Sequence, residues 1–173
     1  LQNFSLAVTQ KIFQTFPLEE INSLHIYLPI LKHNEINTWF IIRKIWQHYP
    51  QITLVTSKTN LPQQTMESYI LAANTTIIEN RWHIPEPVNA THFAEENLEM
   101  MLLPLLGFDR EGHRVGYGKG FYDKFLQKCK PEIIKIGLSW FEPVDKIIDI
   151  HEADVKLDFC VTPAEVFSFL PPA

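Results

Sequence analysis

The chain has 173 residues, of which 15 are Lys or Arg and 20 are Asp or Glu, giving a formal net charge of −5. With 46% apolar and 20% charged residues, it is neither disordered nor collagen-like, and its charge excludes a polybasic nucleic-acid binder. No apolar run reaches the roughly 18 to 20 residues of a membrane span, and residues 1–10 lack the layout of a signal peptide. We therefore expect one cytoplasmic, monomeric domain over residues 1–173, without nucleic-acid or membrane partners and with Cys129 and Cys160 reduced.

Helical and strand patterns alternate along the chain. Apolar residues recur at three- and four-residue steps over 3–16 and 38–48, which predicts two helices that each bury one face. Alternating or β-branched stretches predict strands, in chain order, at 23–28, 51–56, 67–72 and 75–78. The proline-marked stretch 81–89 is predicted to be a loop that forms a site wall.

The second half of the chain continues the alternation. The apolar run EMMLLPL at 99–105 is typical of a central strand that helices cover on both faces, with Pro104 at its end. A helix is predicted at about 120–129, and Pro163 is expected in the first turn of a C-terminal helix. Further strands are predicted at 133–139 and 159–162. Because parallel strands need long crossovers, the fold class is predicted to be α/β, with three layers (α/β/α) and a mostly parallel sheet.

A glycine-rich segment precedes the predicted helix at 120. Its glycines occupy alternate positions, Gly116, Gly118 and Gly120, where a chain can approach an anion closely and adopt positive φ. Arg114 and Lys119 add positive charge, which suits the β- and γ-phosphates of a nucleotide. The spacing matches neither a P-loop nor the dinucleotide fingerprint, so a purely structural turn remains the alternative.

The string FD-x-x-G-x-RVGYGKGFYD, preceded by the apolar strand and Leu-Pro-Leu-Leu-Gly, resembles the signature of the 5-formyltetrahydrofolate cyclo-ligase (methenyltetrahydrofolate synthetase) family. Three other segments resemble family elements in the same order: Tyr27–Thr38, Trp82–Pro87 and His151–Asp158. The resemblance implies that ATP and 5-formyltetrahydrofolate become 5,10-methenyltetrahydrofolate, ADP and phosphate. It also implies that the formyl oxygen attacks the γ-phosphorus.

The resemblance further implies roles for individual residues. The ATP phosphates would lie along Arg114, Val115, Gly116, Tyr117, Gly118, Lys119, Gly120, Phe121 and Tyr122, with Lys119 and Arg114 as the catalytic cations. The magnesium carboxylates would be Asp123 and Asp154, which suffice because Mg²⁺ keeps several waters and phosphate oxygens. The folate pocket would be lined by Glu35, Trp82, Leu105, Leu106, Phe108 and Tyr122.

Each assignment has a structural alternative. Asp154 with Asp158 is also consistent with a solvated acidic turn, and Glu35 with a carboxylate at a helix N-terminus. Trp82 is also consistent with a buried core residue. The seven histidines show no zinc-ligand spacing, and no Ser or Cys lies in a local nucleophile signature.

The start of the chain departs from the family pattern. The family begins with a basic segment that reaches the ATP phosphates, whereas the first charged residue here is Lys11. We expect that the sequence has been trimmed, because it begins with Leu1 rather than Met; the alternative is a protein that lacks this cation. Two other functions stay open: folate or nucleotide binding without turnover, and a sugar-phosphate isomerase or CoA-transferase-like activity on a related sheet.

Overall fold

The computed structural model describes residues 2–173, and its main element is a seven-stranded sheet. The strand order is β11-β10-β9-β6-β1-β2-β3. The five inner strands are parallel, and in sheet order they are β10 (Phe159–Val161), β9 (Ile134–Leu138), β6 (Met100–Pro104), β1 (Ser23–Ile26) and β2 (Thr53–Asn60). The two antiparallel edge strands are β3 (Thr65–Ile70) and β11 (Val166–Ser168). This mixed, mostly parallel sheet confirms the predicted α/β class.

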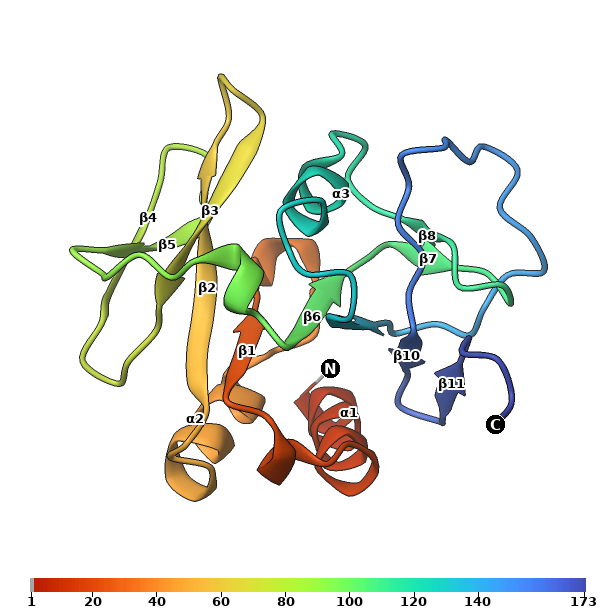
Figure 1. Cartoon of the computed structure of the whole chain (residues 1–173), viewed down its shortest axis with the longest axis horizontal. Helices are drawn as coiled ribbons and strands as arrows, with labels where there is room; N and C mark the ends of the chain where they lie inside the picture. The colour runs from red at the N-terminus through yellow and green to blue at the C-terminus, as the bar shows by residue number, and fades with distance from the viewer. Residues whose placement is uncertain (1) are drawn as a thin grey trace.

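Helices flank the sheet (Figure 1). On one face lie α1 (Gln2–Thr15) and α2 (Trp39–His48), and on the other lies α3 (Phe121–Leu126). The central strand β6 serves both layers, because Met100 and Leu102 pack toward α1 and α2 whereas Met101 and Leu103 pack toward Phe125 of α3. All four β6 side chains are fully buried, which explains why this run carries no polar residue.

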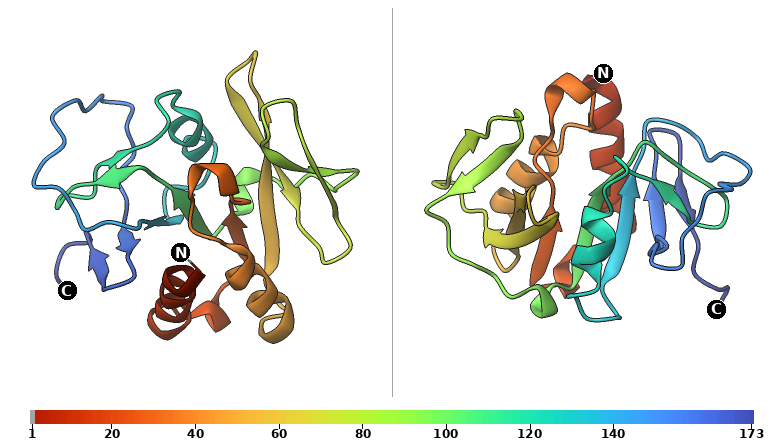
Figure 2. Two further views of the ribbon diagram at one scale, coloured as in Figure 1. Left: turned by 180° about the vertical axis from the view of Figure 1, so that it is seen from behind. Right: turned by 90° about the horizontal axis from the view of Figure 1, so that it is seen from above.

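Two small antiparallel hairpins and three 3₁₀ helices complete the fold. The hairpins are β4 (Thr76–Glu79) with β5 (Pro85–Val88), and β7 (Gly107–Phe108) with β8 (Arg114–Val115). The 3₁₀ helices are η1 (Leu18–Glu20), η2 (Leu31–His33) and η3 (Glu95–Asn97). The first hairpin projects beyond β2 and β3, on the opposite side of the molecule from the C-terminal strands (Figure 2). Among the residues described, no helix is long and apolar enough to cross a bilayer.

Two predicted elements are wrong. The stretch 81–89 contains the strand β5, because in a two-stranded ribbon each strand has a free edge that accepts Pro85 and Pro87 without losing a pairing bond. The C-terminal helix is absent from the described chain, and β11 pairs there with β10. Thr162 Oγ1 accepts the N–H groups of Ala164 and Glu165, so Pro163 lies in a tight turn rather than a helix.

Candidate active site

A cavity of about 660 Å³ opens beside the carboxyl ends of β1 and β6. Ligands of open parallel sheets bind at such ends. Its lining comes from the loop after β1, the last residue of β6, the β2–β3 and β4–β5 hairpins, the glycine-rich loop and residues 149–154. The structure therefore brings together most of the residues predicted for ATP, magnesium and folate: Glu35, Trp82, Asp154 and the continuous segment 114–123.

The glycine-rich loop connects β8 to α3 and forms one wall of this cavity. Gly118 has φ of +82° and Gly120 of +65°, conformations that side chains with a Cβ rarely adopt. A Cβ built at either glycine would meet no atom within 4 Å, so the backbone at both positions faces open space. Lys119, between them, is exposed and lines the cavity. The loop thus presents its backbone and the ammonium group of Lys119, on a flexible side chain, to a ligand.

The second predicted cation, Arg114, is engaged by a carboxylate. Its Nη2 lies 2.7 Å from Asp123 Oδ1, and the two side chains are only 7% and 15% exposed. Asp123 Oδ1 also accepts the N–H of Val155 at 3.0 Å, which holds the segment after Asp154 against α3. Arg114 Nε is buried without a hydrogen-bond partner in the described chain. Lys119 is therefore the exposed cation of the loop, while Arg114 holds Asp123 in place.

Glu35 also lines the cavity and is held by two donors. Its Oε2 accepts the N–H of Ile30 at 2.7 Å, and its Oε1 accepts the hydroxyl of Tyr117 at 2.7 Å. Burial raises the pKa of Glu35 above its usual value, although both hydrogen bonds lower it. Burial likewise raises the pKa of the Tyr117 hydroxyl, which therefore stays a donor. The pair links the loop after β1 to the glycine-rich loop.

Trp82 lies between β4 and β5 and is not a core residue. Its side chain is 44% exposed and lines the cavity, whereas Trp39 and Trp46 pack against the apolar core. The guanidinium of Arg81 lies 3.9 Å from the centre of the Trp82 ring. The hairpin thus presents an aromatic ring to the cavity.

Three of the predicted folate-wall residues do not line this cavity. Phe108 is fully buried and packs edge-to-face on Phe167 and Phe169, with ring centres 5.4 and 6.1 Å apart, so its predicted place on the wall is wrong. Leu105 and Leu106 line a second cavity of about 690 Å³. The two cavities adjoin, because five residues line both: Tyr27, His33, Glu35, Pro104 and Tyr117.

Sequence reasoning missed several lining residues. The first cavity is also lined by three hydroxyl-bearing residues of β2: Thr56, Ser57 and Thr59. Trp140 and Phe141, which follow β9, line the second cavity. None of these residues lies in a motif, and only their position near strand ends could have singled them out.

These features define an α/β protein whose cavity combines open glycine backbone, an exposed lysine and an exposed aromatic ring. Residues 2–163 match the model of the 5-formyltetrahydrofolate cyclo-ligase family, and the chain belongs to this family. It is 27% identical over 167 residues to a 5-formyltetrahydrofolate cyclo-ligase from Mus musculus, covering 89% of this chain and 79% of the relative. It is 31% identical over 180 residues to a probable 5-formyltetrahydrofolate cyclo-ligase from Caenorhabditis elegans, covering 94% and 83%.

Solved structures share the fold. The 5,10-methenyltetrahydrofolate synthetase of Aquifex aeolicus superposes with a TM-score of 0.81 at 21% identity, covering 98% of this chain and 82% of that one. The family and the relatives confirm the resemblance inferred from the sequence. The activity is that of a 5-formyltetrahydrofolate cyclo-ligase, an ATP-dependent ligase of folate one-carbon metabolism. The family assignment rules against the two alternative functions, ligand binding without turnover and a sugar-phosphate isomerase or CoA-transferase-like activity.

Proposed function

We propose that the ligase reaction takes place in the first cavity, with the pterin beside Glu35 and Trp82 and the ATP phosphates along the glycine-rich loop. One observation carries this proposal: groups from widely separated segments, each with one part of the required chemistry, line the same cavity. Glu35 offers acceptor oxygens for the amino and ring N–H groups of the pterin. Trp82 offers a flat apolar face, and Lys119 a fixed positive charge.

In the proposed reaction, the formyl oxygen of 5-formyltetrahydrofolate attacks the γ-phosphorus. An O–P bond forms, the bond to the β-phosphate oxygen breaks, and ADP leaves. N10 then attacks the activated carbon and closes the ring, while phosphate departs with the former formyl oxygen and the N10 proton is released. Phosphoryl transfer needs positioning and charge stabilisation more than covalent help from the protein. Lys119 and the backbone N–H groups of the loop supply that stabilisation.

Magnesium fits the carboxylates at this site as a partner of ATP. No group of three or more His, Cys, Asp or Glu in residues 2–173 could hold a metal ion alone. Asp123 and Asp154 nevertheless line one cavity, and no hydrogen bond among the described residues engages Asp123 Oδ2 or Asp154 Oδ1. One or two carboxylates with phosphate oxygens and waters complete an Mg²⁺ shell. The bound ion would neutralise phosphate charge.

The nucleotide base is assigned to the second cavity. Each cavity has the size of a site for one small ligand, and the reaction needs two. The shared wall at Glu35 and Tyr117 would let the two ligands meet where the γ-phosphate must reach the formyl group. Leu105 and Leu106 would then contact the base rather than the folate.

Isotope transfer tests the proposed chemistry. Substrate labelled with ¹⁸O in the formyl group is converted with magnesium and ATP, and the released phosphate is analysed by mass spectrometry. The proposal requires one labelled oxygen in each phosphate. Unlabelled phosphate, with the label in water, would mean that the formyl oxygen never bonds to phosphorus.

We also propose that residues 1–173 act as one domain, since a single sheet contains strands from both halves of the chain. The monomeric state and the cytoplasmic location stay predictions. Light scattering of the purified protein tests the first, and imaging of the tagged protein in its own cells tests the second.

A further inference from the structure

The segment between Ile147 and Val155 lies at the cavity wall, but its residues are not buried in the core. It contains no helix or strand, its seven residues 148–154 are all exposed, and it brings Asp149, His151 and Asp154 to the cavity wall. Among residues 2–173, the hydrogen bonds made by 148–154 stay within the segment. Its placement therefore depends on what holds its two ends.

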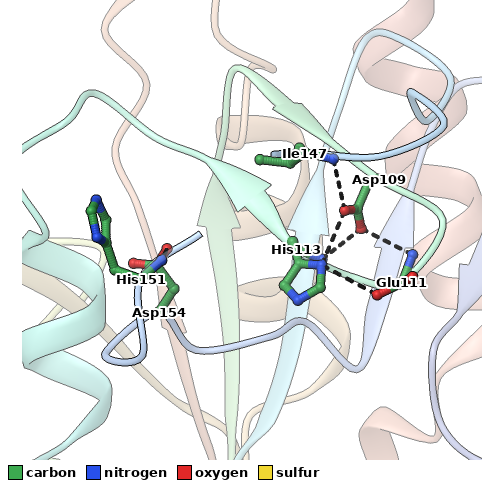
Figure 3. Close-up of polar contacts among 6 residues, drawn as sticks. All are labelled: Asp109, Glu111, His113, Ile147, His151 and Asp154. Atoms are coloured by element: carbon green, nitrogen blue, oxygen red, sulfur yellow. Dashed lines mark hydrogen bonds and ion pairs between the residues drawn. The ribbon is translucent and has the colours of Figure 1, made fainter. Parts of the chain in front are cut away.

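Each end is held by a carboxylate. At one end, Val155 N–H donates to Asp123 Oδ1 at 3.0 Å, and Asp123 belongs to the site itself. At the other end, Ile147 N–H donates to Asp109 Oδ2 at 3.1 Å (Figure 3). Asp109 does not line either cavity and is fully buried.

The buried Asp109 carboxylate is fully partnered. Its Oδ1 accepts the N–H groups of Glu111 and His113, both at 2.9 Å. Its Oδ2 accepts His113 Nδ1 at 3.0 Å in addition to Ile147 N–H. Burial raises the pKa of Asp109, but these hydrogen bonds lower it by more, so the group is charged and a strong acceptor. Arg114, where the glycine-rich segment begins, follows His113 directly.

The β7–β8 hairpin does not depend on Asp109 alone. Backbone bonds close it, from Asp109 N–H to His113 O at 3.0 Å and from Gly112 N–H to Asp109 O at 3.2 Å. Leu157 N–H donates to Gly112 O at 2.9 Å and holds the turn on the core. These backbone bonds would keep the hairpin closed without the Asp109 carboxylate, but none of them would hold Ile147.

The other links between the β7–β8 hairpin and this part of the chain involve residues that precede Ile147. Val144 N–H donates to Phe108 O at 2.9 Å, three residues before Ile147. Arg110 and Asp145 form an ion pair at 3.5 Å, but both side chains are exposed, so the pair contributes little stability. Without Asp109, the unsupported stretch before Val155 would begin near Val144 instead of at Ile147.

We propose that Asp109 is a positioning residue for nucleotide binding: by holding Ile147, it sets the place of Asp154 opposite Asp123. This inference rests on the magnesium role proposed above for Asp154. It assigns to Asp109 a contribution that appears only when magnesium is present. A carboxylate that merely stabilises the fold would not have that signature.

The test measures binding of a non-hydrolysable ATP analogue by calorimetry, with magnesium and with EDTA. Asp109→Asn keeps the size of the side chain but loses charge and one acceptor. We expect it to weaken binding in magnesium by about 10- to 100-fold, as the loss of groups that orient metal ligands does, and to leave binding in EDTA unchanged. The control Glu95→Gln alters another buried carboxylate, which accepts the N–H of Ser68 in β3 at 3.1 Å and lines neither cavity, and it should change neither affinity.

Hydrogen exchange supplies a readout that is independent of ligand. In Asp109→Asn the hydrogen-bonded amides of Ile147, Ile150, His151 and Asp154 should exchange faster than in the wild type, and those of β7 and β8 should not. Ile147→Pro removes the backbone N–H and leaves Asp109 and its hydrogen bonds within the hairpin unchanged, so it decides the question if Asp109→Asn fails to fold. Wild-type affinity in magnesium for the folded variants would overturn the inference.

Asp154→Asn separates the two possible failures. If Asp154→Asn weakens binding in magnesium and the Asp109 and Ile147 variants do not, the positioning inference alone is wrong. If Asp154→Asn itself binds like the wild type in magnesium, the proposed magnesium role fails and the inference fails with it. Weakened binding in all three variants, confined to magnesium, supports both.

Discussion

We predict that His25 makes the stability of this protein sensitive to acid. The side chain lies in β1, is fully buried, and packs on Phe125 with ring centres 5.1 Å apart. Its Nε2 lies 2.5 Å from Ser57 Oγ, and its Nδ1 has no partner among the described residues. Burial lowers the pKa of His25 from 6.5 to about 3, because the charged imidazolium would lose its hydration.

The sign and size of the effect follow from proton linkage. Below pH 6.5 the unfolded chain binds a proton at His25 that the folded protein does not bind, until the pH reaches about 3. Over that window the free energy of unfolding falls by about 1.4 kcal/mol per pH unit. Between pH 7 and pH 5 the loss from His25 is about 2 kcal/mol. In a protein of this size, that lowers Tm by about 4–8 °C.

Urea unfolding of the wild type and of His25→Phe at several pH values measures this loss. The free energy of unfolding of the wild type should fall by about 2 kcal/mol more than that of the variant between pH 7 and pH 5. His48→Phe replaces an exposed histidine and should keep the wild-type dependence. Parallel curves for the wild type and His25→Phe would show that the folded protein protonates His25 as readily as the unfolded chain does.

Two further predictions concern the site. Lys119→Ala should lower kcat/KM for ATP by about 100- to 1,000-fold, because the exposed cation of the loop is lost. A spectrophotometric assay of methenyltetrahydrofolate formation measures this loss. The control Lys124→Ala changes a lysine that is hydrogen-bonded to Gln64 and does not line the cavity, and it should have wild-type kcat/KM. The pKa of Glu35 is raised, so kcat/KM for folate should fall on acidification at a higher pH than for an ordinary glutamate. Tyr117→Phe removes a bond that lowers this pKa and should move the fall to still higher pH, whereas an unmoved profile in this variant would contradict the assigned role of Glu35.

The central layers of the fold could be predicted from the sequence because their periodicity is set by burial. The run at 99–105 became β6, and the helical patterns became α1 and α2. Phe4 is an exception on the predicted buried face of α1: it is exposed and contacts Trp140 edge-to-face at 6.2 Å. It lies at the second cavity, which no local pattern reveals.

The glycine-rich loop and its neighbours could be placed because their motif is long and continuous. What surrounds them depends on contacts between distant segments. Asp109 meets Ile147 across 38 positions, and Tyr117 meets Glu35 across 82. Phe108 was expected on the wall of the folate pocket because it is aromatic, but Phe167 of β11 packs on its ring. A strand at 166–168 was not predicted because its pairing partner, β10, decides its conformation.

Phosphate binding by the glycine-rich loop would be seen in a crystal structure of the protein with magnesium, a non-hydrolysable ATP analogue and 5-formyltetrahydrofolate. We expect phosphate oxygens on the backbone N–H groups of Gly116–Gly120 and on Lys119 Nζ, with the γ-phosphate facing the formyl oxygen and the pterin on Glu35. A triphosphate bound elsewhere, with no contact to the glycine-rich loop, would show that this loop is not the phosphate site.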